Sequence, residues 1–343
     1  MQTLAPSRAT RQFIPISPLL LSSKNGLSVD VFLKVDANAT PKLYCSRRLQ
    51  VGSRQLQLLL DAGISKLYIE SESYKSYLSD LHSNWESILA DDSPIQADRT
   101  ALMYEVVRVI LGEQFKSDDA SSIVRECQKL SGSLVNVLRT YPATISQLHD
   151  LMHHDYALCT HSSNVAIYIA LLARELSFSD SDVEQIVVGA LVHDIGKLQT
   201  QDGILAKPER LDDFEYREVK KHPSVGLRRL LSNQQLLSYG QLMMVYQHHE
   251  KLNGSGYPVG IPDAEIHPWA KMCAVIDTFE ALTSHRPQRK PVSHETALAV
   301  LENLSRTELD AEIVQCWKSL VRRPVECRED GEVKLHFLNH EQA

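Results

Sequence analysis

Residues 248–258 read HHEKLNGSGYP, and residues 192–197 read VHDIGK. The first stretch places two imidazoles and a carboxylate directly before a glycine-rich turn that contains a tyrosine. The second places a histidine beside an aspartate at the end of an apolar run. Imidazoles and carboxylates together suit hard-to-borderline divalent metals such as iron, manganese and zinc. The two stretches therefore predict a metal site in the second half of the chain.

More residues of the same two types lie on the apolar helical patterns around these stretches. His161 opens a pattern of apolar residues at steps of three and four, so it is expected on a buried helix face. We expect Asp182 to cap the next helix, which runs past His193 and Asp194 and ends at Gly196. Adjacent residues on a helix diverge by about 100°. His193 and Asp194 can therefore share a site only where the helix ends or where Asp194 bridges two metals.

Three further helices are predicted, at residues 214–231, 240–249 and 268–281, the last with Pro268 in its first turn. Five helices would thus each point one or two ligands inward, as helical bundles do around dinuclear metal centres. Each ligand taken singly has a plainer interpretation, since a lone histidine on an apolar face is more often a core residue. Their order on successive helices favours the metal site, with the candidate ligands His161, His193, Asp194, His222, His248, His249 and Asp277.

Composition limits the classes of protein that this chain can be. Its 343 residues are 43% hydrophobic and 23% charged, as in ordinary globular proteins of two or three domains. A formal net charge of −7 argues against broad nucleic-acid binding. The six cysteines form no CxxC pair, so neither a zinc ribbon nor a disulfide framework is expected and a reducing cytoplasm fits best. No apolar run approaches the roughly 18 residues of a spanning helix, so membrane insertion is not expected.

The patterns predict a mainly α fold with a small α+β domain at residues 1–95. There, alternating apolar residues at 29–35 predict a strand that pairs with 42–46, followed by a helix at 54–62 closed by Gly63 and a strand at 66–69. Residues 91–98 have linker composition. Connecting helices are expected at 96–150, one of them starting at Asp118 and Asp119, then a helical catalytic domain at 151–325 and a tail at 326–343.

Segments 192–197 and 248–258 together resemble the HD-GYP family, the branch of HD-domain phosphohydrolases associated with breakdown of cyclic di-GMP. The likeness spans roughly residues 161–290 and includes both motifs. It implies an HD-GYP helical bundle in which His161, His193 and Asp277 hold one metal, His222, His248 and His249 hold the other, and Asp194 bridges the two. It further implies that Lys197, Tyr257, Arg286 and Arg289 contact the substrate, with Asp194 and Lys197 as the catalytic residues.

Three positions depart from the family pattern. Ala157 stands where some members have a glutamate that helps to hold a third metal, so two metals are expected here. Gln288 replaces the usual aromatic residue, and Glu280 stands where aspartate is common. Glu250 is expected either to orient an imidazole ring or to be a solvated surface acid.

The function implied by the resemblance is a phosphodiesterase that linearises cyclic di-GMP to pGpG, and further to GMP, by attack of a metal-bridging hydroxide on phosphorus. The two divalent metals are expected to be iron or manganese, with zinc or nickel as alternatives. Expected partners are diguanylate cyclase (GGDEF) proteins and a second copy of the chain, paired through helices between residues 100 and 151. Two alternatives stay open, a cyclic-dinucleotide sensor or scaffold with little turnover, and a phosphohydrolase of another nucleotide, against which the GYP loop argues.

Overall fold

The computed structural model describes residues 12–21, 27–34, 39–49, 51–89, 96–151, 157–200, 203–232 and 236–323. The chain divides into two units, and the boundary along the sequence falls between Val106 and Val107, inside helix α3 (Gln96–Gln114). Residues 96–98, expected in a linker, are already helical. The predicted tail at 326–343 lies outside the described residues.

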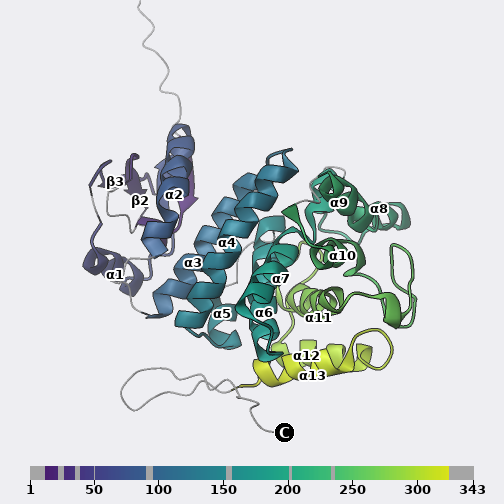
Figure 1. Ribbon diagram of the computed structural model, residues 1–343. Coiled ribbons are helices and arrows are strands. Elements are labelled where there is room, and N and C mark those ends of the chain that lie inside the picture. The colour runs from purple at the N-terminus through teal and green to yellow at the C-terminus, as the bar shows by residue number, and fades with distance from the viewer. Residues whose placement is uncertain are drawn as a thin grey trace, which may run out of the picture. The chain divides into compact units, whose positions relative to one another are not determined.

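The N-terminal unit contains an antiparallel sheet in the order β1-β4-β2-β3. Figure 1 labels β2 and β3 of this sheet and the helices α1 and α2 of the same unit. The predicted pairing of residues near 31 and 42 is confirmed, and so are the helix before Gly63 and the strand that follows it. Val35 lies outside the described residues. Strand β1 and the long helix α2 were not predicted. The elements of this unit are β1 (Phe13–Ile16), β2 (Val31–Leu33), β3 (Lys42–Cys45), β4 (Leu67–Glu70), α1 (Ser53–Asp61) and α2 (Tyr74–Leu89), with the short 3₁₀ helices η1 (Pro18–Leu21) and η2 (Ser71–Ser73).

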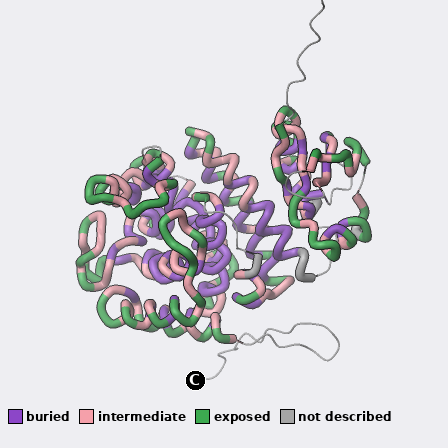
Figure 2. The backbone as a smooth tube through the Cα atoms, turned by 180° about the vertical axis from the view of Figure 1, so that it is seen from behind, coloured by how far each residue is buried: buried purple, intermediate pink, exposed green. Residues whose placement is uncertain are grey.

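Helices α6 (Leu158–Glu175) and α7 (Asp180–Val192) form the centre of the C-terminal unit. Every residue of α6 from Thr160 to Ala173 is buried, which is typical of a helix covered on all sides (Figure 2). Helices α4 and α10 pack on α7, and α11 packs on α6. The other described helices of this unit are α4 (Ala120–Thr140), α5 (Ile145–Leu151), α8 (Asp213–Val219), α9 (His222–Leu231), α10 (Tyr239–Gln247), α11 (Pro268–Thr283), α12 (His294–Leu304) and α13 (Ala311–Val321), with η3 (Ile195–Gln199) and η5 (Asp263–Glu265).

Helix α7 differs from its prediction at both ends. Ser179 caps it by accepting the amide N–H of Asp182, so Asp182 lies within the first turn. The helix ends at Val192, and Asp194 is the N-cap of the 3₁₀ helix η3, which contains Gly196. The end of regular helix therefore comes just before His193 and Asp194, which is the first of the two arrangements that would let both side chains reach one site.

The predicted helix at 214–231 is in fact two helices, α8 and α9, which are separated at Lys220 and Lys221. Pro223 lies in the first turn of α9, where its missing N–H leaves no hydrogen bond unmade. Inside one continuous helix the same proline would have broken a backbone hydrogen bond. The break places His222 at the start of α9, with its side chain buried.

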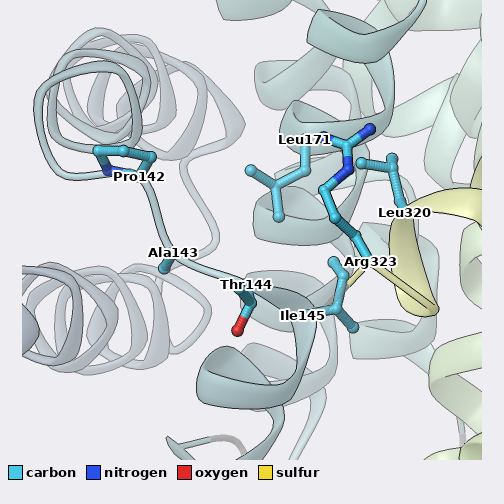
Figure 3. A pocket seen from close by; sticks show the side chains of 7 residues that line it. All are labelled: Pro142, Ala143, Thr144, Ile145, Leu171, Leu320 and Arg323. Atoms are coloured by element: carbon cyan, nitrogen blue, oxygen red, sulfur yellow. The ribbon is translucent and has the colours of Figure 1, made fainter. Parts of the chain in front are cut away.

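Two cavities of the C-terminal unit contain none of the candidate ligands. One, of about 20 Å³, is large enough for about one water molecule (Figure 3). Its lining is mostly apolar and consists of Pro142, Ala143, Thr144, Ile145, Leu171, Leu320 and Arg323. The other is a polar cleft of about 400 Å³ between α4, α7 and the start of α10. Within the described residues, no helix is long and apolar enough to cross a lipid bilayer.

Candidate metal centre

All seven candidate ligands converge in the C-terminal unit, in two adjoining groups. One group consists of His161, His193 and Asp277, and the other of Asp194, His222, His248 and His249. Within each group, one ligand atom from every side chain lies within 4.8 Å of the others. Neither Asp277 nor His222 turns away into solvent, since both are buried.

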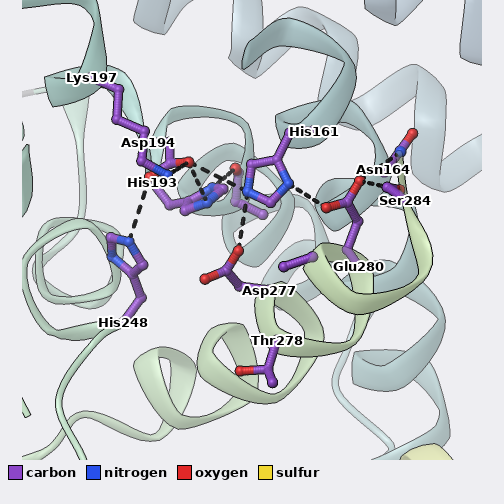
Figure 4. Close-up of polar contacts among 12 residues, drawn as sticks. His161, Asn164, His193, Asp194, Lys197, His248, Asp277, Thr278, Glu280 and Ser284 are labelled. Atoms are coloured by element: carbon purple, nitrogen blue, oxygen red, sulfur yellow. Dashed lines mark hydrogen bonds and ion pairs between the residues drawn. The ribbon is translucent and has the colours of Figure 1, made fainter. Parts of the chain in front are cut away.

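Asp194 lies between the two groups and presents one oxygen to each (Figure 4). Its Oδ2 is 3.3 Å from His161 Nε2 and 3.4 Å from His193 Nε2. Its Oδ1 is 3.1 Å from His222 Nε2 and 3.6 Å from His248 Nε2. On the far side of the first group, His161 Nε2 is 3.0 Å from Asp277 Oδ1. This is the arrangement that a carboxylate bridging two cations requires.

Backbone carbonyls fix the tautomers of three of the imidazoles. The Nδ1 atoms of His193, His222 and His248 donate to the carbonyls of Ala190 (2.7 Å), Val219 (2.7 Å) and Val245 (3.0 Å). Because a carbonyl can only accept, each Nδ1 carries the ring proton and each Nε2 keeps a lone pair that faces the cluster. Neutral imidazoles held in this way are ready to bind a metal through Nε2.

The centre of the cluster has the features of a cation site. His222 Nε2 and His248 Nε2 face each other at 3.1 Å, although both carry lone pairs when neutral. His193 Nε2 and Asp194 Oδ1 are buried and form no hydrogen bond. A buried acceptor without a donor is costly, and a divalent cation would satisfy these atoms together. The residues present therefore fit a divalent metal centre.

The charge states of the ligands agree with this fit. Burial lowers the pKa of His248 to about 4 and also lowers the pKa of His222 and His249, so these rings are neutral near pH 7. Burial alone would raise the pKa of Asp194, but the nearby Lys197 ammonium and His193 outweigh it and hold that pKa well below its usual value. These three neutral imidazoles thus lie beside an ionised carboxylate. Burial alone would lower the pKa of His161, but Glu280, Asp194 and Asp277 outweigh it and raise that pKa well above its usual value.

Glu280 is a buried acid whose importance to the site the sequence did not indicate. It accepts hydrogen bonds from His161 Nδ1, Asn164 Nδ2 (2.9 Å) and Ser284 Oγ (2.7 Å). Burial would raise the pKa of Glu280, but His161 outweighs this effect and lowers it to about 2. The signal was its spacing, three residues after Asp277 and so on the same face of α11. Glu280 fixes His161 just as the carbonyls fix the rings of His193, His222 and His248.

Of the four residues expected to contact substrate, two adjoin the cluster. Lys197 is 8% exposed, and its Nζ lies 2.5 Å from Asp194 Oδ2. The ring of Tyr257 stacks on His249, with centroids 4.7 Å apart and an interplanar angle of 26°. Lys197 follows Asp194 on η3, whereas Tyr257 is placed by the turn after α10. Both side chains therefore adjoin the place where a small molecule bound at the cluster would lie.

Arg286 and Arg289 form a tight turn after α11, in which the backbone N–H of each donates to the carbonyl of the other. Arg286 Nη2 lies 3.7 Å from Glu280 Oε2. The Arg289 guanidinium donates to the carbonyl of Ala281, and the side-chain amide of Gln288 donates to the carbonyl of Lys207. Arg286 therefore approaches the cluster through Glu280, while Arg289 serves the turn itself.

Residues 146–313 match the family model described as the HD domain. This region is an HD domain. The match includes all seven clustered ligands and the turns that carry Lys197, Tyr257 and Arg286. The HD-domain resemblance expected from the two motifs is thereby confirmed.

Curated relatives of this chain are named as phosphodiesterases of cyclic dinucleotides. A 3'3'-cGAMP-specific phosphodiesterase of Vibrio cholerae is 38% identical over 152 residues, which cover 44% of this chain and 33% of the relative. A protein of Pseudomonas aeruginosa named cyclic di-GMP phosphodiesterase is 35% identical over 52% of this chain and 42% of its own length. Another protein of that name, from Thermotoga maritima, is 34% identical over 51% of this chain and 46% of its own length. This chain thus matches less than half of the length of each relative.

A solved structure of similar fold is described as an HDG"Y"P protein from Bdellovibrio bacteriovorus. It aligns with a TM-score of 0.67 at 19% identity and covers 91% of this chain and 100% of its own. At that identity the similarity is one of fold. It supports the predicted arrangement of a mainly α protein with a small α+β region before the HD domain.

Glu250 in the HD domain has a different role from either that was expected. It is 3% exposed, and its carboxylate accepts the backbone N–H groups of Val259 (2.8 Å), Gly260 (3.0 Å) and Ile261 (3.3 Å). It therefore neither orients an imidazole nor lies in solvent. The loop at residues 259–261 turns back toward Glu250, so three of its backbone amides converge on this carboxylate. Glu250 holds the turn that presents Tyr257.

Gly196 of the HD domain is required by close packing between η3 and α9. A Cβ at this position would lie 2.0 Å from the backbone oxygen of His222 and 2.7 Å from the backbone nitrogen of Gly226. Only glycine allows this approach. Asp194 and His222 come from the two sides of this contact. The close packing thereby holds Asp194 Oδ1 at 3.1 Å from His222 Nε2.

Proposed function

We propose that this protein is a metal-dependent phosphodiesterase that hydrolyses cyclic di-GMP to pGpG and further to GMP. The observation that carries the proposal is Asp194, whose two oxygens face two groups of Nε2 atoms. The names of the relatives support the substrate class. Because the relatives are matched over less than half of their length, the substrate rests on the site as well as on their names.

A pair of divalent metals, when bound, supplies a water nucleophile of lowered pKa and neutralises charge on the phosphoryl oxygens. In this proposal His161, His193 and Asp277 hold one metal, His222, His248 and His249 hold the other, and Asp194 is shared. The remaining work belongs to the protein's own groups. The carbonyls of Ala190, Val219 and Val245 keep three ring protons on Nδ1, so that the Nε2 atoms stay free to bind.

Lys197 has the role of stabilising charge in this proposal. Its ammonium, 2.5 Å from Asp194 Oδ2, would lie beside a phosphate held at the cluster and meet the charge that develops on its oxygens. Tyr257 offers a ring edge and a hydroxyl to the same ligand, and Arg286 offers a guanidinium from the side of Glu280. We assign Arg289 a weaker contact, since its guanidinium is already bonded to the Ala281 carbonyl.

A second substrate has one specific observation in its favour. The relative that is 38% identical is named a 3'3'-cGAMP-specific phosphodiesterase. The two cyclic dinucleotides differ in one purine base, so the metal centre alone does not distinguish them. Competition between equal concentrations of the two would rank them by the ratio of their kcat/KM values.

The test is an anaerobic assay of full-length protein loaded separately with iron, manganese, zinc or nickel. Chromatography of the products from cyclic di-GMP would give pGpG first and GMP later, with iron or manganese the most active. Tight binding of cyclic di-GMP without turnover under any metal would instead select the sensor or scaffold alternative. Hydrolysis of dNTPs in place of cyclic dinucleotides would select the alternative of another nucleotide.

We further propose that the protein acts in the cytoplasm with diguanylate cyclases that contain GGDEF domains, and that it pairs as a homodimer through helices between residues 100 and 151. The substrate supports the first part, since an enzyme that removes cyclic di-GMP acts on the product of those cyclases. Co-purification with a GGDEF protein and sedimentation at several concentrations would test the two parts separately. A concentration-independent monomer would contradict the dimer.

A further inference from the structure

We propose that Tyr216 and Lys220 form a second subsite of the same active site, which binds the half of a cyclic dinucleotide that is not being cut. This inference rests on the proposed function. It concerns residues that neither the motifs nor the metal cluster include. Tyr216 lies on α8 and Lys220 is the C-cap of that helix, so both come shortly before His222 in the chain.

The exposure of the ligands shows where the cluster opens to solvent. The side chains of His161, His193, Asp194, His222 and His248 are 0% exposed. Those of Asp277 and His249 are 11% and 23% exposed. A substrate must therefore approach over Asp277 and His249. Tyr257, which stacks on His249, borders this opening.

Lys220 extends the border outward from Tyr257. Its ammonium lies 5.5 Å from the centroid of the Tyr257 ring and 5.1 Å from that of Tyr216, so one cation lies over both rings. Distances under about 6 Å are those of cation–π contacts. His249, Tyr257, Lys220 and Tyr216 thus follow one another from the metal centre to the surface.

The surrounding charges leave Lys220 available to an anion. Glu215 pairs with Lys207 at 2.8 Å, and Glu218 pairs with Lys221 at 2.5 Å. Among the described residues, no carboxylate forms an ion pair with Lys220. Since the whole chain carries a formal charge of −7, a substrate with two phosphates depends on such local cations. Lys197 serves the phosphate at the metals, and Lys220 serves the other.

Tyr216 has the exposure of a stacking surface. It is 51% exposed, so its ring does little to fill the core. Aromatic rings at such positions stack on nucleobases of any kind, and loss of one stacked base weakens binding by about 5- to 100-fold. A purine on Tyr216 would place its phosphate toward Lys220, with the reacting phosphate at the cluster.

The experiment compares Tyr216→Ala and Lys220→Met with matched controls on the same segment. Phe214→Ala removes an aromatic ring that is 57% exposed on α8, and Lys221→Met removes the adjacent lysine, which already pairs with Glu218. Each full-length variant is assayed with cyclic di-GMP and with methyl p-nitrophenyl phosphate, a diester with one phosphate and no purine. Calorimetry on chelated protein measures binding of cyclic di-GMP independently of turnover.

We expect both subsite variants to raise KM and the dissociation constant for cyclic di-GMP about 5-fold or more, with kcat and the methyl p-nitrophenyl phosphate activity within about 2-fold of wild type. Both controls should match wild type. Unchanged binding of cyclic di-GMP by the subsite variants would overturn the subsite alone, and so would an equal loss with both substrates. A wild-type protein that cleaves the small diester but does not bind cyclic di-GMP would overturn the proposed function itself.

Discussion

At the scale of single residues, Asp194 is the one side chain that both halves of the site share. Asp194→Asn keeps the size of the side chain but removes its charge and replaces one carboxylate oxygen with an NH2 group that cannot bind a metal. We expect metal content to fall from about two to one or fewer per chain, and kcat to fall more than about 100-fold. Elemental analysis and turnover measure the two effects. Asp180→Asn, an exposed acid at the start of α7, is the control and should change neither.

Glu280 gives a second residue-scale prediction, because its carboxylate fixes a ligand without itself facing the metals. Glu280→Gln should weaken metal binding about 10- to 100-fold, as loss of a partner to a ligating imidazole does elsewhere. Glu280→Asp should restore part of it, since a carboxylate is kept on a shorter stem. Metal affinity from competition with a fluorescent chelator is the readout. Equal affinity in wild type and Glu280→Gln would show that His161 does not need this carboxylate to bind a metal.

The sequence predicted the ligands better than the residues that support them. Histidines and aspartates at the ends of apolar helices indicate a metal by their chemical type, and all seven indeed converge. That they bind metal stays a prediction. Glu250 and Glu280 are both glutamates next to a ligand motif, yet one holds a loop by three amides and the other holds His161. Spacing along the chain does not distinguish these roles, because the partners come from other segments.

At the scale of elements, the contact between η3 and α9 decides how close the two groups of ligands come. Gly196→Ala should force these elements apart, because its Cβ would lie 2.0 Å from the His222 oxygen. We expect the free energy of unfolding to fall by about 1–3 kcal/mol and the metal content to drop. Gly132→Ala in α4 is the matched control, since its nearest neighbour is a side-chain oxygen at 3.8 Å. That change should be neutral or stabilising in chemical denaturation, as alanine is favoured within helices. Equal stability of the two variants would contradict the packing role of Gly196.

The elements themselves were predicted where one apolar stripe repeats without interruption. Helix α4 begins after Asp119, as predicted. Its apolar residues at steps of three and four are all buried: Val124, Cys127, Leu130, Leu134 and Leu138. The break between α8 and α9 was missed because the apolar pattern continues across it, whereas Pro223 makes it necessary. Strand β1 was missed because its four residues include Pro15 and their burial does not alternate. Tertiary pairing with β4 determines that strand.

At the scale of the whole molecule, the ligands all belong to one of the two units, so metal should stabilise that unit alone. A metal present at 100 times its dissociation constant adds about 2.7 kcal/mol to the folded state. For a unit of this size the melting temperature should rise by roughly 5–10 °C. Calorimetry of the full chain should therefore show two transitions. The melting temperature of the C-terminal unit should fall when metal is chelated and recover when metal is restored. The melting temperature of the N-terminal unit should not change. His193→Ala removes a ligand from one of the two groups, so the metal-dependent shift of the C-terminal transition should become smaller. A shift of both transitions together in wild type would mean that the units unfold as one. A shift of neither would contradict the metal centre, since ligands that come together around a cation only in the folded state must stabilise that state when they bind it.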